Sequence, residues 1–290
     1  MILRRIKPMK ENKLLRGLCV LTAALMLGLT GCANGSDTNG SDAQSQADTA
    51  EVQSAWTELD QTTITKEMGM GWNLGNQLEA SNAGIPSETT WGNPTISEDL
   101  IKAVKEQGFK TVRIPVSYLD KIGAAPDYTI DSAWLDRVQE VVDYVVGNDL
   151  YAIINIHGDG YYTVDKSWLR CVDDNQDEIK DKYEKVWAQI ADRFKDYDQH
   201  LIFESMNEES DNTYGKPNAT GYENINAYNQ IFVDTVRKTG SNNEKRWLLI
   251  PGWNTNIEYT AGNYGFVIPT DSGCKADGNR LMISVHYYDC

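Results

Sequence analysis

The chain is poor in basic residues and in histidine, and both shortages exclude classes of function. Its 27 lysines and arginines stand against 42 aspartates and glutamates, which gives a net charge of −15. A surface of this sign repels phosphate backbones, and no basic patch or basic helix is visible, so we exclude nucleic acid as a partner. The three histidines form no HxH or HExxH pair. We therefore predict neither a metal ion nor any other cofactor.

The five cysteines are too scattered for a disulfide framework or a zinc motif. Cys19 lies in the apolar leader and Cys32 follows it, which leaves an odd set with no CxxC spacing, namely Cys171, Cys274 and Cys290. We expect at least one of these three thiols to stay free.

The first 31 residues are typical of an export signal. Six basic residues precede an apolar stretch over 18–29, which is shorter than the roughly 20 apolar residues that span a bilayer. Residues 29–32, Leu-Thr-Gly-Cys, look like a bacterial lipobox, whose cysteine becomes the diacylated N-terminus. We predict a lipoprotein signal over 1–31 and anchoring at the cell surface through Cys32, with this lipid as the only membrane contact. An ordinary secretory signal with an incidental cysteine is the alternative.

Composition separates a tether from a folded domain. Residues 32–53 are mostly Ser, Asp, Gln, Asn, Gly and Thr, so after the lipidated cysteine we predict a disordered tether. Residues 54–290 form one domain in which apolar runs alternate with amphipathic stretches at helical spacing. The predicted strands are 69–73, 111–115, 151–157, 201–207, 247–251 and 282–286. The predicted helices cover 96–104, 135–145, 179–194 and 225–236.

This alternation predicts a parallel sheet, either open and doubly wound or closed as a barrel. No GxGxxG or phosphate-binding loop follows a strand, whereas polar and aromatic residues follow nearly every strand, where a barrel has its active site. We therefore predict an α/β fold of the TIM (β/α)8 barrel class. Strands begin about 40 residues apart, so only about six of the eight βα units fit into this chain. We expect the natural terminus to lie beyond Cys290.

The strongest local signal for chemistry is the run Leu-Ile-Phe-Glu-Ser-Met-Asn-Glu over 201–208. It brings Asn207 and Glu208 to the C-terminal end of a strand, where a carboxylate can transfer a proton and a carboxamide can bind a sugar hydroxyl. The alternative is an ordinary helix N-terminus with Asn207 as its cap. Arg113 stands inside a strand that reads as central, so it needs a carboxylate partner.

Further strand ends agree with this signal, because His157 ends one strand while His286 and Tyr288 follow another on one face. At this point the chain resembles the cellulases of glycoside hydrolase family 5, and most of all the subfamily of bacterial endoglucanases, lichenases and xyloglucanases. The matching segments are 71–76 (GWNLGN), 90–94 (TWGNP), 111–115 (TVRIP), 154–157 (INIH), 203–208 (FESMNE) and 285–288 (VHYY). The resemblance spans essentially the whole of 54–290. It implies that these residues are a catalytic domain, incomplete at its C-terminus.

The resemblance implies a retaining endo-β-1,4-glucanase that degrades β-glucan polysaccharides or oligosaccharides. It makes Glu208 the general acid/base, Asn207 a ligand of the 2-hydroxyl at the cleavage site and Arg113 the residue that orients the nucleophile. His157, His286 and Tyr288 would line the same subsite. Trp253, Trp91 and Trp168 are candidate stacking platforms for sugar rings, and the alternative for each is an ordinary place in the core.

Two departures from the family pattern matter. The chain has Gly158 where the family often has a second histidine, and its 290 residues do not reach the seventh strand, which supplies the nucleophilic glutamate. Retention needs two carboxyl groups about 5 Å apart. We do not expect Glu204, Glu209 or Glu79 to substitute, because the first lies four residues back along the strand, the second diverges at its end and the third belongs to another loop.

We therefore predict that the chain alone is inactive. The alternative is a non-catalytic surface protein that binds β-glucan. A metal-dependent barrel hydrolase is a further alternative, but it would have only His157 and His286 at strand ends.

Overall fold

The computed structural model describes residues 56–213 and 215–288, which belong to one compact unit. The predicted signal, the predicted lipidation site Cys32, the predicted tether and Cys290 lie outside the described residues. Within those residues, no helix is both long enough and apolar enough to cross a membrane.

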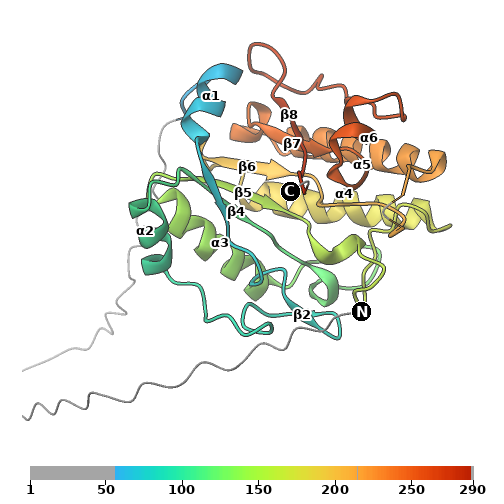
Figure 1. Cartoon of the computed structure of the whole chain (residues 1–290), viewed down its shortest axis with the longest axis horizontal. Coiled ribbons are helices and arrows are strands. Elements are labelled where there is room, and N and C mark those ends of the chain that lie inside the picture. Colours follow the sequence, from blue (N-terminus) through green and yellow to red (C-terminus); the bar gives the residue numbers. More distant parts are fainter. Residues whose placement is uncertain (1–55, 214, 289–290) are drawn as a thin grey trace, which may run out of the picture. The chain divides into compact units, whose positions relative to one another are not determined.

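Six strands form one parallel sheet in the order β1-β4-β5-β6-β7-β8, which Figure 1 follows from blue to red. Their bounds are Gly71–Asn73, Thr111–Ile114, Tyr151–Asn155, Leu201–Glu204, Leu248–Pro251 and Leu281–Ser284. Each strand pairs in parallel with its neighbour in the order. All six predicted strands and their parallel arrangement are therefore confirmed.

The four predicted helices are also present. They are α2 (Glu98–Glu106), α3 (Ser132–Val146), α4 (Gln176–Arg193) and α5 (Ala219–Lys238). Side chains cap three of them, because Ser97, Asp131 and Asn218 each accept a backbone N–H of the first turn. Short elements that the sequence pattern did not indicate are α1 (Gln61–Met68), α6 (Ile257–Ala261) and a hairpin of β2 (Ser81–Asn82) and β3 (Ile85–Pro86). Short 3-10 turns occur at Leu119–Lys121, Gly158–Gly160, Ser241–Glu244 and Trp253–Thr255.

Alternation along the strands divides the core into two clusters. Ile154 and Phe203 belong to the large cluster that the helices cover, whereas their neighbours Ile153 and Ile202 belong to a smaller cluster on the other face. Ile64 of α1 packs into that smaller cluster. Successive side chains of a strand point to opposite faces, so the sheet has one helix-covered side and one inner side, as in a barrel wall.

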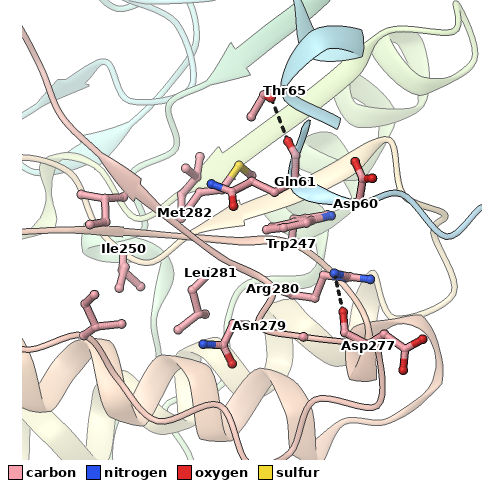
Figure 2. Close-up of a pocket in the computed structure, with 14 residues that line it drawn as sticks. Asp60, Gln61, Thr65, Trp247, Ile250, Asp277, Asn279, Arg280, Leu281 and Met282 are labelled. Atoms are coloured by element: carbon pink, nitrogen blue, oxygen red, sulfur yellow. Dashed lines mark hydrogen bonds between the residues drawn. The ribbon is translucent and has the colours of Figure 1, made fainter. Parts of the chain in front are cut away.

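The described sheet has two edge strands, β1 and β8. A groove of about 790 Å³ runs beside β8, and Figure 2 shows Trp247, Leu281 and Met282 among its lining residues. Ile283 of β8 is exposed. The six described strands therefore form an open part of a barrel wall rather than a closed ring.

Candidate active site

Strand register brings polar side chains together on the inner side of the sheet. Asn73 of β1 pairs with Arg113 of β4, and Asn155 of β5 pairs with Glu204 of β6. The Arg113 guanidinium donates to Glu204 Oε2 (Nε, 2.8 Å), to Asn207 Oδ1 (Nη2, 2.8 Å) and to Asn73 Oδ1 (Nη1, 3.2 Å). The predicted carboxylate partner of Arg113 is thus confirmed, and it is Glu204.

Glu204 is fully engaged by its neighbours. Its side chain is 1% exposed, and Oε2 accepts from both Arg113 and Asn155 Nδ2, the latter at 2.9 Å. Ser284 Oγ of β8 donates to the other oxygen, Oε1, at 2.6 Å. A carboxylate buried and bonded in this way fixes the positions of its partners and is closed to substrate.

Glu208 lies four residues beyond the end of β6 and is the centre of a second group. His286 Nδ1 lies 2.6 Å from Glu208 Oε1, and the Tyr288 hydroxyl donates to the same oxygen. The Glu208 side chain keeps 17% of its surface exposed. Burial alone would raise the pKa of Glu208, but the contacts with His286 and Tyr288 outweigh burial and hold this pKa below its ordinary value.

His157 stands beside this group as a neutral ring. Burial, aided by the nearby Arg113 charge, lowers the pKa of His157 to about 3. Its Nδ1 lies 3.3 Å from Asn155 Nδ2, and its ring meets Tyr161 edge to face with centroids 6.2 Å apart. At neutral pH the uncharged imidazole can orient a hydroxyl group but carries no charge of its own.

Tyr161 joins the two groups, and sequence reasoning missed it. Its hydroxyl accepts from Asn207 Nδ2 and donates to Glu208 Oε2 at 3.4 Å. The segment that carries Tyr161 is held in place by the buried Asp159, which accepts the backbone N–H groups of Tyr118 and Leu119. A tyrosine in an irregular loop gives no periodic signal, so only the fold reveals its position.

The structure brings together most of the predicted site. Direct contacts form a chain of side chains through Arg113, Asn207, Tyr161, Glu208, His286 and Tyr288. Among the described residues, no group of three or more His, Cys, Asp or Glu side chains is placed to hold a metal ion.

The three predicted tryptophan platforms occupy different environments. Trp253 is 0% exposed and packs against Tyr222 in the core, so the expectation that it stacks on a sugar ring is corrected: it has no free face. Trp168 is half-buried, with its Nε1 donating to Asp159 Oδ1 at 2.7 Å and Lys182 over its ring. Trp91 alone of the three is 52% exposed.

The family model described as "Cellulase (glycosyl hydrolase family 5)" matches residues 73–290. A positioned carboxyl group at the C-terminal end of a barrel strand fits the active site of a glycoside hydrolase. The chain belongs to glycosyl hydrolase family 5, the cellulase family, and its half-barrel sheet is part of the TIM-barrel fold of that family.

The proteins similar to this chain include endoglucanases and a xyloglucanase. Endoglucanase A of Paenibacillus barcinonensis is 62% identical over 229 residues, which are 78% of this chain and 57% of that protein. A solved family 5 xyloglucanase from Paenibacillus pabuli is also 62% identical, with a TM-score of 0.77 over 78% of this chain and 64% of that one. A broad-specificity endoglucanase from Ruminococcus champanellensis, solved with bound cellotriose, is 41% identical with a TM-score of 0.73, over 81% of this chain and 68% of that one. The chain thus spans less than two thirds of the Paenibacillus relatives.

Proposed function

We propose that this chain is the part of a retaining endo-β-1,4-glucanase that binds β-glucan and supplies the acid/base, Glu208. The observation that carries the proposal is the bonding of Glu208. It keeps an exposed edge while His286, Tyr288 and Tyr161 orient its two oxygens. A positioned carboxyl group of this kind can protonate the oxygen of a departing sugar and later activate water. Family membership and the activities for which similar proteins are named support the same chemistry.

The neighbours of Glu208 have matching roles in this proposal. Arg113 donates to Asn207 Oδ1, and the Asn207 amide donates to Tyr161, so both ends of the carboxamide are fixed. A fixed carboxamide beside the acid/base suits recognition of a sugar hydroxyl at the reacting ring. Neutral His157 adds a hydrogen-bonding group without adding charge.

No carboxylate among the described residues is placed to act as the nucleophile. The Glu204 carboxylate is already occupied by contacts with Arg113, Asn155 and Ser284. Glu209 is 1% exposed, and its two carboxyl oxygens lie buried without partners. Glu79 is 7% exposed, and its two carboxyl oxygens accept the backbone N–H groups of Asn76 and Gln77. We therefore propose that the nucleophile lies outside the described residues and that the 290-residue chain binds glucan without cleaving it.

The lowered pKa of Glu208 agrees with the absence of a nucleophile among the described residues. A general acid works best when its pKa is near the working pH, and a second carboxylate close by is the usual means of raising it. In this chain the contacts with His286 and Tyr288 instead hold the pKa of Glu208 low. The same observation favours the second candidate function, a surface protein that binds β-glucan and has no catalytic role.

We further propose that Cys32 anchors the protein at the outside of the cell through its lipid. A glucan-binding cleft at the cell surface would meet polymers that do not enter the cell. Labelling growing cells with a clickable palmitate analogue tests this proposal, because Cys32→Ser should abolish labelling and release the protein into the medium. Unchanged labelling of the Cys32→Ser protein would refute it.

Calorimetric titration of the purified chain with a soluble β-glucan tests the proposed function. We expect saturable binding that Trp91→Ala and Asn207→Ala weaken. Val267→Ala is the matched control, because Val267 is exposed and lines neither the groove beside β8 nor the pocket beside Trp91. Absence of any binding to mixed-linkage glucan, cello-oligosaccharides and xyloglucan would refute it.

A further inference from the structure

The carboxyl group of Glu209, next to the proposed acid/base, is buried and has no role in the function proposed above. The residue is 1% exposed, and neither Oε1 nor Oε2 has a hydrogen-bond partner among the described residues. Its backbone is held in place, because Glu209 O accepts the N–H of Asn254 in the loop after β7 at 2.8 Å. Buried polar groups in folded proteins are nearly always hydrogen-bonded, so this carboxyl group calls for an explanation.

The Glu209 carboxyl group packs directly against Gly160. A Cβ at position 160 would overlap both carboxyl oxygens, so only a glycine leaves room for them. Gly160 ends the 3-10 turn Gly158–Gly160, whose three residues are all buried. Because protein interiors are close-packed and have little spare volume, any movement of the carboxyl group requires a movement of this turn.

The 3-10 turn leads directly into Tyr161, which contacts the proposed acid/base. The Tyr161 hydroxyl accepts from Asn207 Nδ2 and donates to Glu208 Oε2 at 3.4 Å. Glu209 follows Glu208 in the chain, just as Tyr161 follows Gly160. The two segments therefore touch at two adjacent points, and a shift at the first point is passed on to the second.

The surroundings of the Glu209 carboxyl group disfavour a negative charge on it. The titratable groups that interact with it electrostatically are Asp159 and Tyr161 of the loop after β5, Cys171 before α4, Tyr183 of α4, Tyr228 of α5 and Glu208. None of these six groups is a cation. Burial, together with the charges of Asp159 and Glu208, raises the pKa of Glu209 well above its ordinary value. The carboxyl group is therefore uncharged at mildly acidic pH and acquires its charge only as the pH rises.

We propose that Glu209 is a positioning residue for Glu208 and that it acts through Gly160. While its carboxyl group is uncharged, the turn stays packed and Tyr161 keeps its hydrogen bonds. Ionisation moves the turn aside, because a carboxylate needs water or hydrogen-bond donors, which the closed packing does not offer. The cleft therefore binds β-glucan best below the pH at which Glu209 ionises. The choice of β-glucan as the ligand rests on the proposed function, whereas the movement of the turn is independent of it.

Two uncharged replacements separate the charge of Glu209 from its packing. Glu209→Gln keeps the size of the side chain, and Glu209→Met is an apolar side chain of similar length, so a folded form of either variant suffices. The matched control is Glu223→Gln, at an exposed glutamate of α5, which should behave as the wild type. The pKa of Asp159 is also raised, to about 6, but Asp159 is present in all four proteins and its contribution cancels.

Calorimetric titration of the full chain with soluble mixed-linkage β-glucan measures the effect on binding, at about pH 5 and about pH 8. We expect the dissociation constant of the wild type, divided by that of Glu209→Gln, to rise roughly tenfold between the two pH values. A ratio that is the same at both pH values would overturn the proposal, because a role in packing alone does not depend on pH.

Hydrogen–deuterium exchange of a peptide that covers 158–161 measures the movement of the turn without any ligand. This segment is identical in the wild type and Glu209→Gln, so its intrinsic exchange rate is equal in both at a given pH. The wild type should exchange faster than the variant at about pH 8 and equally fast at about pH 5. Equal exchange at both pH values would overturn the proposal whether or not glucan binds. If the turn opens as expected but the wild type binds no glucan at either pH, the proposed function falls and the positioning of Tyr161 by Glu209 stands.

Discussion

The Arg113 guanidinium lies 2.6 Å from the Glu204 carboxylate, and this ion pair links β4 to β6 across the intervening strand β5. Asn155 of β5 donates to the same carboxylate oxygen. Because Arg113 also donates to Asn207, the pair fixes the residue next to the proposed acid/base. A structural ion pair inside the sheet thus sets the geometry of the candidate active site.

Removing one partner of this pair should leave a buried charge without compensation. We expect Arg113→Met to lower the free energy of unfolding by about 3–5 kcal/mol. Urea denaturation followed by tryptophan fluorescence measures the change. The double variant Arg113→Met with Glu204→Gln should recover part of the loss, since no charge is then left behind. A change below about 1 kcal/mol for the single variant would show that the ion pair does not hold the sheet together.

The hydroxyl of Tyr288 helps to keep Glu208 ionised. Tyr288→Phe removes a donor to Glu208 Oε1, so the pKa of Glu208 should rise from its lowered value toward its ordinary one. Carbon-13 NMR of labelled glutamate side chains measures this titration. Tyr287→Phe, at the exposed neighbouring tyrosine, is the control and should leave the pKa of Glu208 unchanged.

Glu209 should make stability depend on pH. Burial, together with the charges of Asp159 and Glu208, raises the pKa of Glu209 well above its ordinary value. A group whose folded pKa is raised stabilises the protein below its unfolded pKa, and this contribution is lost as pH rises toward the folded value. The melting temperature of Glu209→Gln, relative to that of the wild type, should therefore increase as pH rises from about 4.5 to 8. A difference between the two proteins that does not vary with pH would be evidence against a protonated Glu209.

Gly160 and Glu209 occupy complementary space. A Cβ at position 160 would overlap the Glu209 carboxyl group. We expect Gly160→Ala to destabilise the fold by about 1–3 kcal/mol, as overpacking does. The double variant Gly160→Ala with Glu209→Ala should lose less free energy of unfolding than the two single variants lose together. Denaturation of the wild type, both single variants and the double variant measures these losses. Additive costs would show that the two sites are independent.

Much of the fold could be predicted because its signals are periodic. Buried β-branched runs and amphipathic stretches revealed six strands and four helices, and the strand position of Arg113 indicated a buried carboxylate partner. The identity of that partner required the sheet register, since Glu204 lies 91 positions away in sequence. The contacts of Glu208 with His286 and Tyr288 likewise join segments about 80 positions apart.

The mistaken or missed elements lack a periodic signal. A tryptophan after a strand can point into the core or the cleft, and Trp253 points into the core. Tyr161 and Asp159 belong to an irregular segment whose path depends on contacts with the loop after β4. The short α1 helix and the β2–β3 hairpin are too brief to show a pattern above that of a loop.

We propose that the described residues supply an acid/base and a glucan-binding cleft but no nucleophile. The most direct test measures reducing ends released from soluble mixed-linkage β-glucan by the purified 290-residue chain, in samples whose binding of the polymer is established by calorimetry. We predict bound glucan and no product above the background of Glu208→Gln. Product formation by the wild-type chain that Glu208→Gln abolishes would contradict the claim, because the described residues would then contain a working nucleophile.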